Sequence, residues 1–260
     1  MLITIEGVDC SGKETQSNIL AERLRKEGKT VAKYSFPFYS SPTGRIVGRP
    51  YLGKDNNSYF EEGASHVDPY VASLYFAADR KYNEKIIEDA LKNNDYVILD
   101  RYIYSNMAHQ GCKLKESEQD EFFNFISKLE FDLLKLPKPD IAFFLYLPVD
   151  LVKILKQNRK EREDDHEKDV NYLLNAEKTY KKLAKECSFT EIDCFKGDQI
   201  RSVDDIANEI YIYVKNERYN CAKIKNVAFV KWRLCNEKFK RHCHLCWQGK
   251  SIEKSRKSIF

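Results

Sequence analysis

The sequence predicts a three-layer α/β/α fold, in which helices cover both faces of a five-stranded parallel sheet. Two observations carry this prediction. Short β-rich segments alternate with segments of helical periodicity along most of the chain. In addition, the segments at residues 95–100 and 140–147 are almost entirely apolar, which is typical of parallel strands that are buried on both faces.

The expected strands and helices alternate from residue 2 onward. Strands are expected at residues 2–6, 30–36, 95–100, 140–147 and 189–194. Helices are expected at residues 15–26, 41–52, 69–94, 103–109, 116–134, 150–157, 168–187 and 203–214. The periodic pattern ends near Asn216, so we expect one domain over residues 1–216 and a basic, cysteine-containing extension over residues 217–260.

The composition is that of a globular protein. Apolar residues make up 42% of the 260 residues, which is enough for a packed core and excludes a disordered chain. The 44 basic and 40 acidic residues leave a net charge of only +4, and the basic excess lies mainly in residues 223–257. Bulk charge therefore does not predict a nucleic-acid binder.

The beginning of the chain carries no sign of a targeting signal, because it runs directly into an expected strand. No apolar run approaches the roughly 20 residues that cross a bilayer. We therefore expect a cytoplasmic protein without a membrane partner, whose eight cysteines are reduced.

A glycine-containing loop follows the first expected strand and opens the first expected helix. Its sequence, GVDCSGK, matches the G-x-x-x-x-G-K phosphate-binding signature in the context that the signature requires. Glycines let backbone N–H groups curl around a phosphate, the helix N-terminus adds its dipole, and Lys13 adds a full positive charge. The expected ATP-binding residues are Gly7, Asp9, Cys10, Ser11, Gly12, Lys13, Glu14 and Thr15.

The residue after Lys13 departs from the signature. A serine or threonine commonly stands there as a Mg²⁺ ligand, whereas this chain has Glu14 followed by Thr15. A carboxylate is also a hard oxygen ligand that suits Mg²⁺, directly or through water. Glu14 either replaces the hydroxyl or points to solvent. Together with Asp100, Glu14 and Thr15 are the candidate Mg²⁺ ligands.

Charged residues at two further places suggest a kinase that acts on a small acceptor. Asp100 and Arg101 follow the third expected strand, at the sheet edge where open α/β sheets bind ligands. Arg159 and Arg162 lie in a charged run that suits a mobile lid at about residues 158–167. Taken alone, this run is more typical of a solvated charged face.

Six segments together resemble the thymidylate kinases in order and spacing. They are EGVDCSGKETQ at 6–16, FP at 36–37, LYFAADR at 74–80, DRY at 100–102, SNMAHQG at 105–111 and LPKPD at 136–140. The resemblance covers about residues 2–215. The stretch over residues 69–167 is similar to the bacterial branch, in which the GKE variant of the phosphate loop is also found. The resemblance implies a P-loop fold, transfer of a phosphoryl group from ATP to dTMP with Mg²⁺, and a homodimer.

The resemblance also implies roles in binding the base and sugar of the acceptor. Phe76 would stack on the thymine ring. Arg80 and Asn106 would contact the base, and Gln110 would lie near the base and the sugar. Asp9 would meet the 3′-hydroxyl of the deoxyribose.

The implied phosphate and sugar contacts include two departures from the family. Arg101 and Tyr39 would contact the acceptor phosphate. The arginine that the family commonly carries within or just after the Phe-Pro pair is absent, since Phe38 and Tyr39 stand there, and Arg45 is the candidate to compensate. His109 stands where relatives often have an aromatic residue against the sugar, so we expect looser rejection of a 2′-hydroxyl.

The expected mechanism rests on charge, because phosphoryl transfer needs positioning and charge neutralisation more than covalent help. Lys13, Arg101 and Mg²⁺ would surround the transferring group, joined by a lid arginine. That arginine would be Arg159 or Arg162. The acceptor phosphate is already anionic, so Asp100 is assigned to the metal or its water rather than to a base. The alternatives are a kinase for another nucleoside monophosphate or a deoxynucleoside, or a non-catalytic nucleotide-binding protein.

The extension at residues 217–260 contains Cys243 and Cys246, which have the C-x-x-C spacing of half a zinc site. Cys221 or Cys235 would complete four ligands, but these two cysteines form no second C-x-x-C pair. The basic and aromatic residues of the extension also suit nucleic acid. Because its apolar residues lack sustained periodicity, we favour an extension that is dispensable for catalysis.

Overall fold

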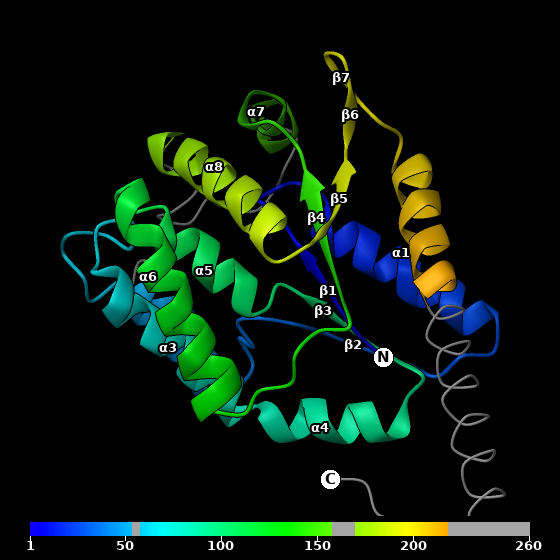
Figure 1. The fold of residues 1–260 in the computed structure, drawn as a ribbon, viewed down its shortest axis with the longest axis horizontal. Coiled ribbons are helices and arrows are strands. Elements are labelled where there is room, and N and C mark those ends of the chain that lie inside the picture. Colours follow the sequence, from blue (N-terminus) through cyan, green and yellow to red (C-terminus); the bar gives the residue numbers. More distant parts are fainter. Residues whose placement is uncertain (54–57, 158–169, 218–260) are drawn as a thin grey trace, which may run out of the picture. The chain divides into compact units, whose positions relative to one another are not determined.

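The computed structural model describes residues 1–53, 58–157 and 170–217 of the chain. Five strands form one parallel sheet in the order β2-β3-β1-β4-β5. They are β1 (Leu2–Glu6), β2 (Val31–Ser35), β3 (Tyr96–Asp100), β4 (Ile141–Tyr146) and β5 (Thr190–Asp193). Figure 1 shows helix α1 (Lys13–Lys26) on one face of this sheet and helices α5 (Ile103–Gly111) and α8 (Val170–Glu186) on the other. The predicted α/β fold with five parallel strands is confirmed.

The remaining elements connect these strands and helices. They are α2 (Pro42–Ile46), the π-helical turn η1 (Val47–Tyr51), α3 (Pro69–Tyr82), α4 (Glu84–Asn93), α6 (Glu116–Ser127), the π-helical turn η3 (Lys128–Leu133), α7 (Val149–Gln157), and the antiparallel strands β6 (Phe195–Lys196) and β7 (Gln199–Ile200). A last helix covers residues 203–217. The chain divides into the compact units Met1–Tyr211 and Ile212–Phe260. None of the helices in the described ranges is long and apolar enough to cross a membrane.

The helix predicted over residues 69–94 is interrupted, so the prediction of one continuous helix is wrong. α3 and α4 lie on either side of Asn83, whose backbone is not helical (φ −96°, ψ 6°). The Asn83 amide donates to the backbone oxygen of Asp79 (2.8 Å) and to Ser41 Oγ (3.2 Å). Side-chain bonds of this kind compete with the helical hydrogen bonds. The helix predicted over residues 116–134 likewise changes form, because its last turn, η3, is π-helical.

The central pairing of the sheet sets the positions of the chain segments that leave it. β1 and β3 are buried along their whole length, and β1 lies between β3 and β4. Ile5 pairs with Asp100, and the backbone N–H of Arg101 donates to the oxygen of Ile5 at 3.1 Å. This register brings Asp100 and Arg101 beside the glycine loop that follows β1, at the predicted edge of the sheet.

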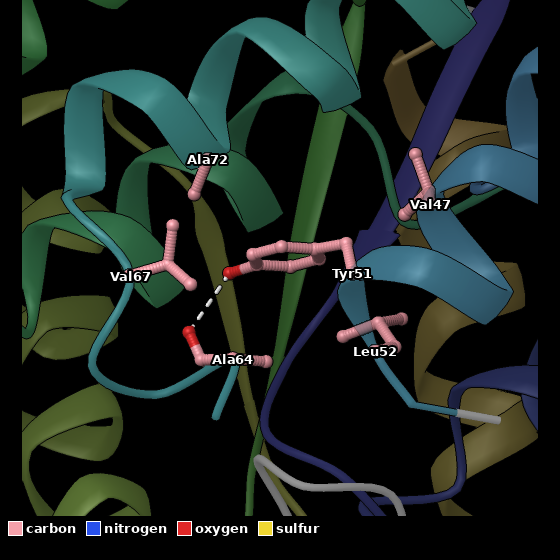
Figure 2. Close-up of a cluster of buried hydrophobic side chains, with 6 residues drawn as sticks. All are labelled: Val47, Tyr51, Leu52, Ala64, Val67 and Ala72. Atoms are coloured by element: carbon pink, nitrogen blue, oxygen red, sulfur yellow. Dashed lines mark hydrogen bonds between the residues drawn. The ribbon is translucent and has the colours of Figure 1, made fainter. Parts of the chain in front are cut away.

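A cluster of buried apolar side chains joins η1, the loop before α3 and α3 itself. Figure 2 shows its members, Val47, Tyr51, Leu52, Ala64, Val67 and Ala72. The Tyr51 hydroxyl donates to the oxygen of Ala64 at 3.1 Å, and Phe76 packs against the cluster. Lys113 donates to the oxygens of Ala64 (2.7 Å) and Val67 (3.0 Å), and burial lowers the pKa of its amine to about 8. The cluster therefore fixes the surroundings of Phe76.

Candidate active site

A cleft of about 740 Å³ opens where the strands of the sheet end. Residues that come at or just after the carboxyl ends of all five strands line it, as is expected for a ligand site of an open α/β sheet. The cleft collects nearly all of the site residues predicted in the described part of the chain. These are Asp9, Cys10, Ser11, Gly12, Lys13, Glu14, Thr15, Tyr39, Phe76, Arg80, Asp100, Arg101, Asn106, His109 and Gln110.

The loop between β1 and α1 is curled tightly by its two glycines. Gly7 has φ +152°, and a Cβ atom there would lie 2.6 Å from Ser11 Oγ and 2.8 Å from the backbone oxygen of Leu145. Gly12 has φ +87°, a left-handed conformation that favours glycine, and it precedes the first residue of α1. The two glycines therefore permit the turn that points the N-terminus of α1 toward the cleft.

Lys13 is the first residue of α1 and is buried beneath this loop. Its Nζ donates to the backbone oxygen of Val8 at 2.6 Å. Burial lowers the pKa of Lys13 to about 8, and the carboxylates of Asp9 and Asp100 partly oppose that shift. Lys13 is thus a desolvated cation at the loop, which is the arrangement that binds phosphate oxygens most strongly.

The candidate Mg²⁺ ligands differ in exposure. Glu14 and Thr15 are exposed at the cleft, while Asp100 is buried at the end of β3. Within the described residues, no group of three or more His, Cys, Asp or Glu side chains is arranged to hold a metal. Mg²⁺ is usually held by one or two carboxylates together with waters and substrate phosphates, so this open oxygen set fits Mg²⁺ bound along with a nucleotide.

Arg101 lies at the centre of a charged network. Its backbone is left-handed (φ +64°), and its guanidinium forms an ion pair with Asp9. It also donates to the backbone oxygen of Gly7 at 3.4 Å. Burial alone would lower the pKa of Arg101, but the carboxylate of Asp9 raises it above its ordinary value. Asp9 therefore neutralises the arginine that was predicted to bind the acceptor phosphate, in addition to its own predicted sugar contact.

His109 is fixed by contacts that the sequence did not indicate. The Tyr172 hydroxyl, on α8, donates to the backbone oxygen of His109 (3.0 Å) and lies 3.1 Å from His109 Nδ1. Because the Tyr172 hydroxyl donates its proton to the backbone oxygen of His109, it can only accept from Nδ1–H of the same residue. Nε2 then carries a lone pair and accepts from Arg101 Nη1 at 3.1 Å. His109 therefore links Arg101 to α8.

Glu6 lies fully buried at the end of β1. It accepts from the backbone N–H of Tyr102 (2.9 Å) and from Ser105 Oγ (2.5 Å), and Ser105 in turn lies 2.9 Å from the Tyr180 hydroxyl. Burial raises the pKa of Glu6, and the hydrogen bond from Ser105 partly offsets this. Glu6 is the one acidic residue of the buried strand Leu2–Glu6, and this position is the signal in the sequence for a buried carboxylate.

The predicted base-binding residues lie together on α3 and α5. Phe76 packs edge-on against Tyr51, with ring centroids 5.5 Å apart. Arg80 is only 3% exposed and forms a two-point ion pair with Glu130, a residue that no motif singled out. Asn106 Oδ1 and Gln110 Nε2 are buried and have no hydrogen-bond partner among the described residues. These two atoms are available to a ligand in the cleft.

Two residues between β2 and α3 were predicted to serve the acceptor phosphate, Tyr39 in the loop after β2 and Arg45 on α2 as a candidate to compensate for the missing arginine. Tyr39 lines the cleft and is 41% exposed. Arg45 donates to the backbone oxygen of Ser40 (3.4 Å) and is not among the residues that line the cleft. The structure therefore gives no support to Arg45 as a replacement for the missing family arginine.

A further group of cleft residues was not predicted. It consists of Leu147, Leu155, Cys194, Ile200, Arg201, Val203 and Ile206. Gln16 Nε2, on α1, donates to the backbone oxygen of Val203 at 3.0 Å, which holds the segment after β7 beside the phosphate loop. Several of these residues lie in or at the ends of elements that the sequence predicted, but no motif marked any of them as part of a site. The predicted lid residues Arg159 and Arg162 lie outside the described residues.

The sheet order and the loop between β1 and α1 define a P-loop nucleotide-binding protein, in which one cleft extends from the phosphate loop to the side chains of α3 and α5. A family model described as thymidylate kinase matches residues 5–205. The chain belongs to the thymidylate kinase family, as the six sequence segments indicated.

Known relatives cover most of the chain. A probable thymidylate kinase of Methanocaldococcus jannaschii is 36% identical over 216 residues, which are 83% of this chain and 96% of the relative. A thymidylate kinase of Mycobacterium tuberculosis is 31% identical over 189 residues, or 71% and 86% of the two chains. The solved structure of thymidylate kinase from Candida albicans matches with a TM-score of 0.63 and 25% identity, and covers 84% and 92%. Because these relatives are archaeal, bacterial and fungal, the bacterial branch stays a prediction.

We predict that Glu14→Ser retains substantial phosphoryl-transfer activity with a changed dependence on Mg²⁺. Carboxylate and hydroxyl oxygens both serve Mg²⁺, and exposed Thr15 lies beside residue 14. The rate is measured against free Mg²⁺ concentration, with Glu22→Ser, an exposed position of α1, as the control. A folded Glu14→Ser protein without activity would show that Glu14 is indispensable.

Proposed function

We propose that the protein transfers the terminal phosphoryl group of ATP to dTMP, giving ADP and dTDP for the synthesis of dTTP. The observation that supports this most strongly is the single cleft, which the phosphate loop shares with a pocket of aromatic and hydrogen-bonding side chains. Membership in the thymidylate kinase family supports the same pair of substrates. We also propose that the protein acts in the cytoplasm, where nucleotides and reducing conditions prevail.

The pocket suits a thymine nucleotide in both shape and hydrogen bonding. Phe76 offers an aromatic face, already supported by Tyr51, for stacking against the base. The free oxygen of Asn106 suits the N3–H group of thymine, and Arg80 suits its O4 atom. Gln110 adds a buried amide donor toward the base and sugar.

The acceptor phosphate would bind to Arg101, with Tyr39 beside it. In exchange, Asp9 would leave Arg101 and accept a hydrogen bond from the 3′-hydroxyl of the sugar. Arg101 would keep an anionic partner throughout this exchange, because the phosphate takes the place of a carboxylate next to the same guanidinium.

Transfer would proceed by charge neutralisation. Lys13 and the N-terminus of α1 hold the phosphates of ATP, and Arg101 faces them from the acceptor side. Glu14, Thr15 and Asp100 would hold Mg²⁺ with the phosphates, and Mg²⁺ supplies further positive charge there. The lid arginines would complete the site.

The second candidate function is phosphoryl transfer from ATP to a wider range of acceptor nucleotides. His109 replaces a larger aromatic residue against the sugar, which favours tolerance toward ribose. The solved structure of the Candida albicans thymidylate kinase is titled as revealing the origin of broad substrate specificity in that protein.

We further propose that the protein is a homodimer that assembles through α3. Val71 (44% exposed), Leu74 (50%) and Tyr82 (61%) lie on one face of this helix, since their spacing of 3 and 8 residues returns to the same side. Exposed apolar stripes of this kind mark protein interfaces. The catalytic unit would end near Asn216 and would not require residues 217–260.

We predict that Lys13→Ala lowers turnover of dTMP by at least about 100-fold, because it removes a charge that acts in a water-poor site. ADP formation is measured with a panel of nucleosides and nucleoside monophosphates. Lys26→Ala, an exposed lysine in the last turn of α1, is the control. Near-normal activity of Lys13→Ala, or use of another monophosphate while dTMP is ignored, would refute the proposed function.

We predict that His109→Tyr makes the site stricter toward the sugar. A side chain that only crowds a hydroxyl contributes about 1–3 kcal/mol to discrimination, so the larger ring should raise the preference for dTMP over its ribose counterpart by about 10-fold or more. The values of kcat/KM for both nucleotides are compared in wild type and variant. An equal preference for dTMP over its ribose counterpart in the wild type and in His109→Tyr would contradict this prediction.

We predict that Leu74→Lys converts the dimer into a monomer, because it places a charge in the middle of the apolar stripe. Analytical ultracentrifugation gives the mass. Ile46→Lys, which changes an exposed apolar residue on α2, is the control and should leave the dimer intact. A wild-type protein that sediments as a monomer contradicts the proposed assembly.

A further inference from the structure

Glu130 is a fully buried acidic residue that lies in the π-helical turn η3. Its two oxygens accept from Nε (2.5 Å) and Nη2 (2.6 Å) of Arg80, which is itself 3% exposed. A carboxylate of this kind is costly to bury unless its charge and lone pairs are satisfied. The pair leaves Nη1 of Arg80, with its two N–H groups, unused by Glu130.

Glu130 lies four residues after buried Ile126, so it continues the buried face of α6 into η3, whereas the π-helical form changes the exposure of the residues that follow. In a regular helix that continued α6, Leu133 would lie on the same face as buried Ile126, seven residues earlier. Instead Leu133 is 66% exposed, whereas Glu130 and Phe131 are buried. π-Helical turns are rare and are found often at functional sites.

Glu130 also fixes the orientation of the Asn106 amide. Asn106 Nδ2 donates to Glu130 Oε1 (3.1 Å) and to the backbone oxygen of Ser73 (3.2 Å). Both partners are acceptors, so only the NH₂ group of the amide can face them. The amide oxygen must therefore point the other way, and it is buried without a partner in the described part of the chain, in a side chain that lines the cleft.

We propose that Glu130 determines which class of base the acceptor site takes, an inference that rests on the proposed function. By holding Arg80 and Asn106 together, it presents one hydrogen-bond donor and one acceptor to the cleft. This pair is complementary to the N3–H and C4=O groups of thymine. In cytosine the roles are reversed, because N3 is an unprotonated acceptor and the 4-amino group is a donor. The same pair of side chains would then leave buried polar groups unpaired.

The test compares dTMP with 5-methyl-2′-deoxycytidine monophosphate, which keeps the methyl group and changes only the hydrogen-bonding edge. Values of kcat/KM are measured for wild type and Glu130→Gln, with folding checked by circular dichroism and thermal unfolding. Asp132→Asn makes the same chemical change at an exposed position of η3 and is the matched control.

The wild type and Asp132→Asn should prefer dTMP by about 10⁴-fold, the level reached by sites whose polar groups would be left unpaired. In Glu130→Gln the amide nitrogen of residue 130 can face Asn106, so the Asn106 amide loses its charged acceptor and is held by the backbone oxygen of Ser73 without it. The preference for dTMP should fall at least about 10-fold, mainly through a higher KM for dTMP. A purely structural role would lower kcat/KM for both nucleotides equally and leave the preference unchanged, which overturns the inference.

If Glu130→Gln does not fold, Glu130→Asp decides the question, because it keeps the charge but is too short to hold both partners. An unchanged preference in Glu130→Asp also overturns the inference. Failure of the proposed function is a different result, since the wild type itself would then not phosphorylate dTMP.

Discussion

The parallel pairing of β1 with β3 is the constraint on which the rest of the structure depends. It places the glycine loop and Arg101 side by side, because the Arg101 N–H continues the pairing by donating to the oxygen of Ile5 at 3.1 Å. Buried Glu6 extends the pairing past the end of the strand by accepting from the N–H of Tyr102 at 2.9 Å. The phosphate side and the acceptor side of the cleft are therefore parts of one rigid unit rather than two loops brought together by a ligand.

The two arginines of the acceptor pocket differ in how firmly they are held. Arg80 and Glu130 are 3% and 0% exposed, so this ion pair is a permanent part of the core. Arg101 and Asp9 are 19% and 16% exposed and face the cleft. In the proposed function, a phosphate that enters the cleft would take the place of Asp9, because this pair is partly exposed and both residues line the cleft. Arg80 therefore holds a fixed position in the pocket, while Arg101 would exchange its partner.

The sequence predicted those parts of the structure that local signals specify. Apolar runs located the central strands, and the spacing of Gly7, Gly12 and Lys13 located the phosphate loop. Family resemblance located the cleft residues of α3 and α5, although their roles remain proposals. The lining formed by residues 194–206 was missed, because no motif marks these residues and the two-residue strands among them carry no periodic signal.

Contacts between distant residues explain the other differences. Glu130 is 50 residues from Arg80, and Tyr172 is 63 residues from His109, so neither partnership leaves a pattern in one sequence. The break at Asn83 has the same origin, because the interruption involves a side-chain bond to Ser41, which is 42 residues away. In each case tertiary hydrogen bonding decides a local conformation or the role of a residue.

The central claim, that donor and acceptor nucleotides share one preformed cleft, is tested most directly by calorimetry with a conjugate in which adenosine and thymidine are joined through a pentaphosphate. A ligand that fills both pockets gains from the second contact without a second loss of freedom. We expect one conjugate per chain, bound more tightly than either ATP or dTMP, and no binding of either nucleotide once the conjugate is present. A conjugate that binds no more tightly than dTMP alone, or that leaves the ATP site open, would contradict the account.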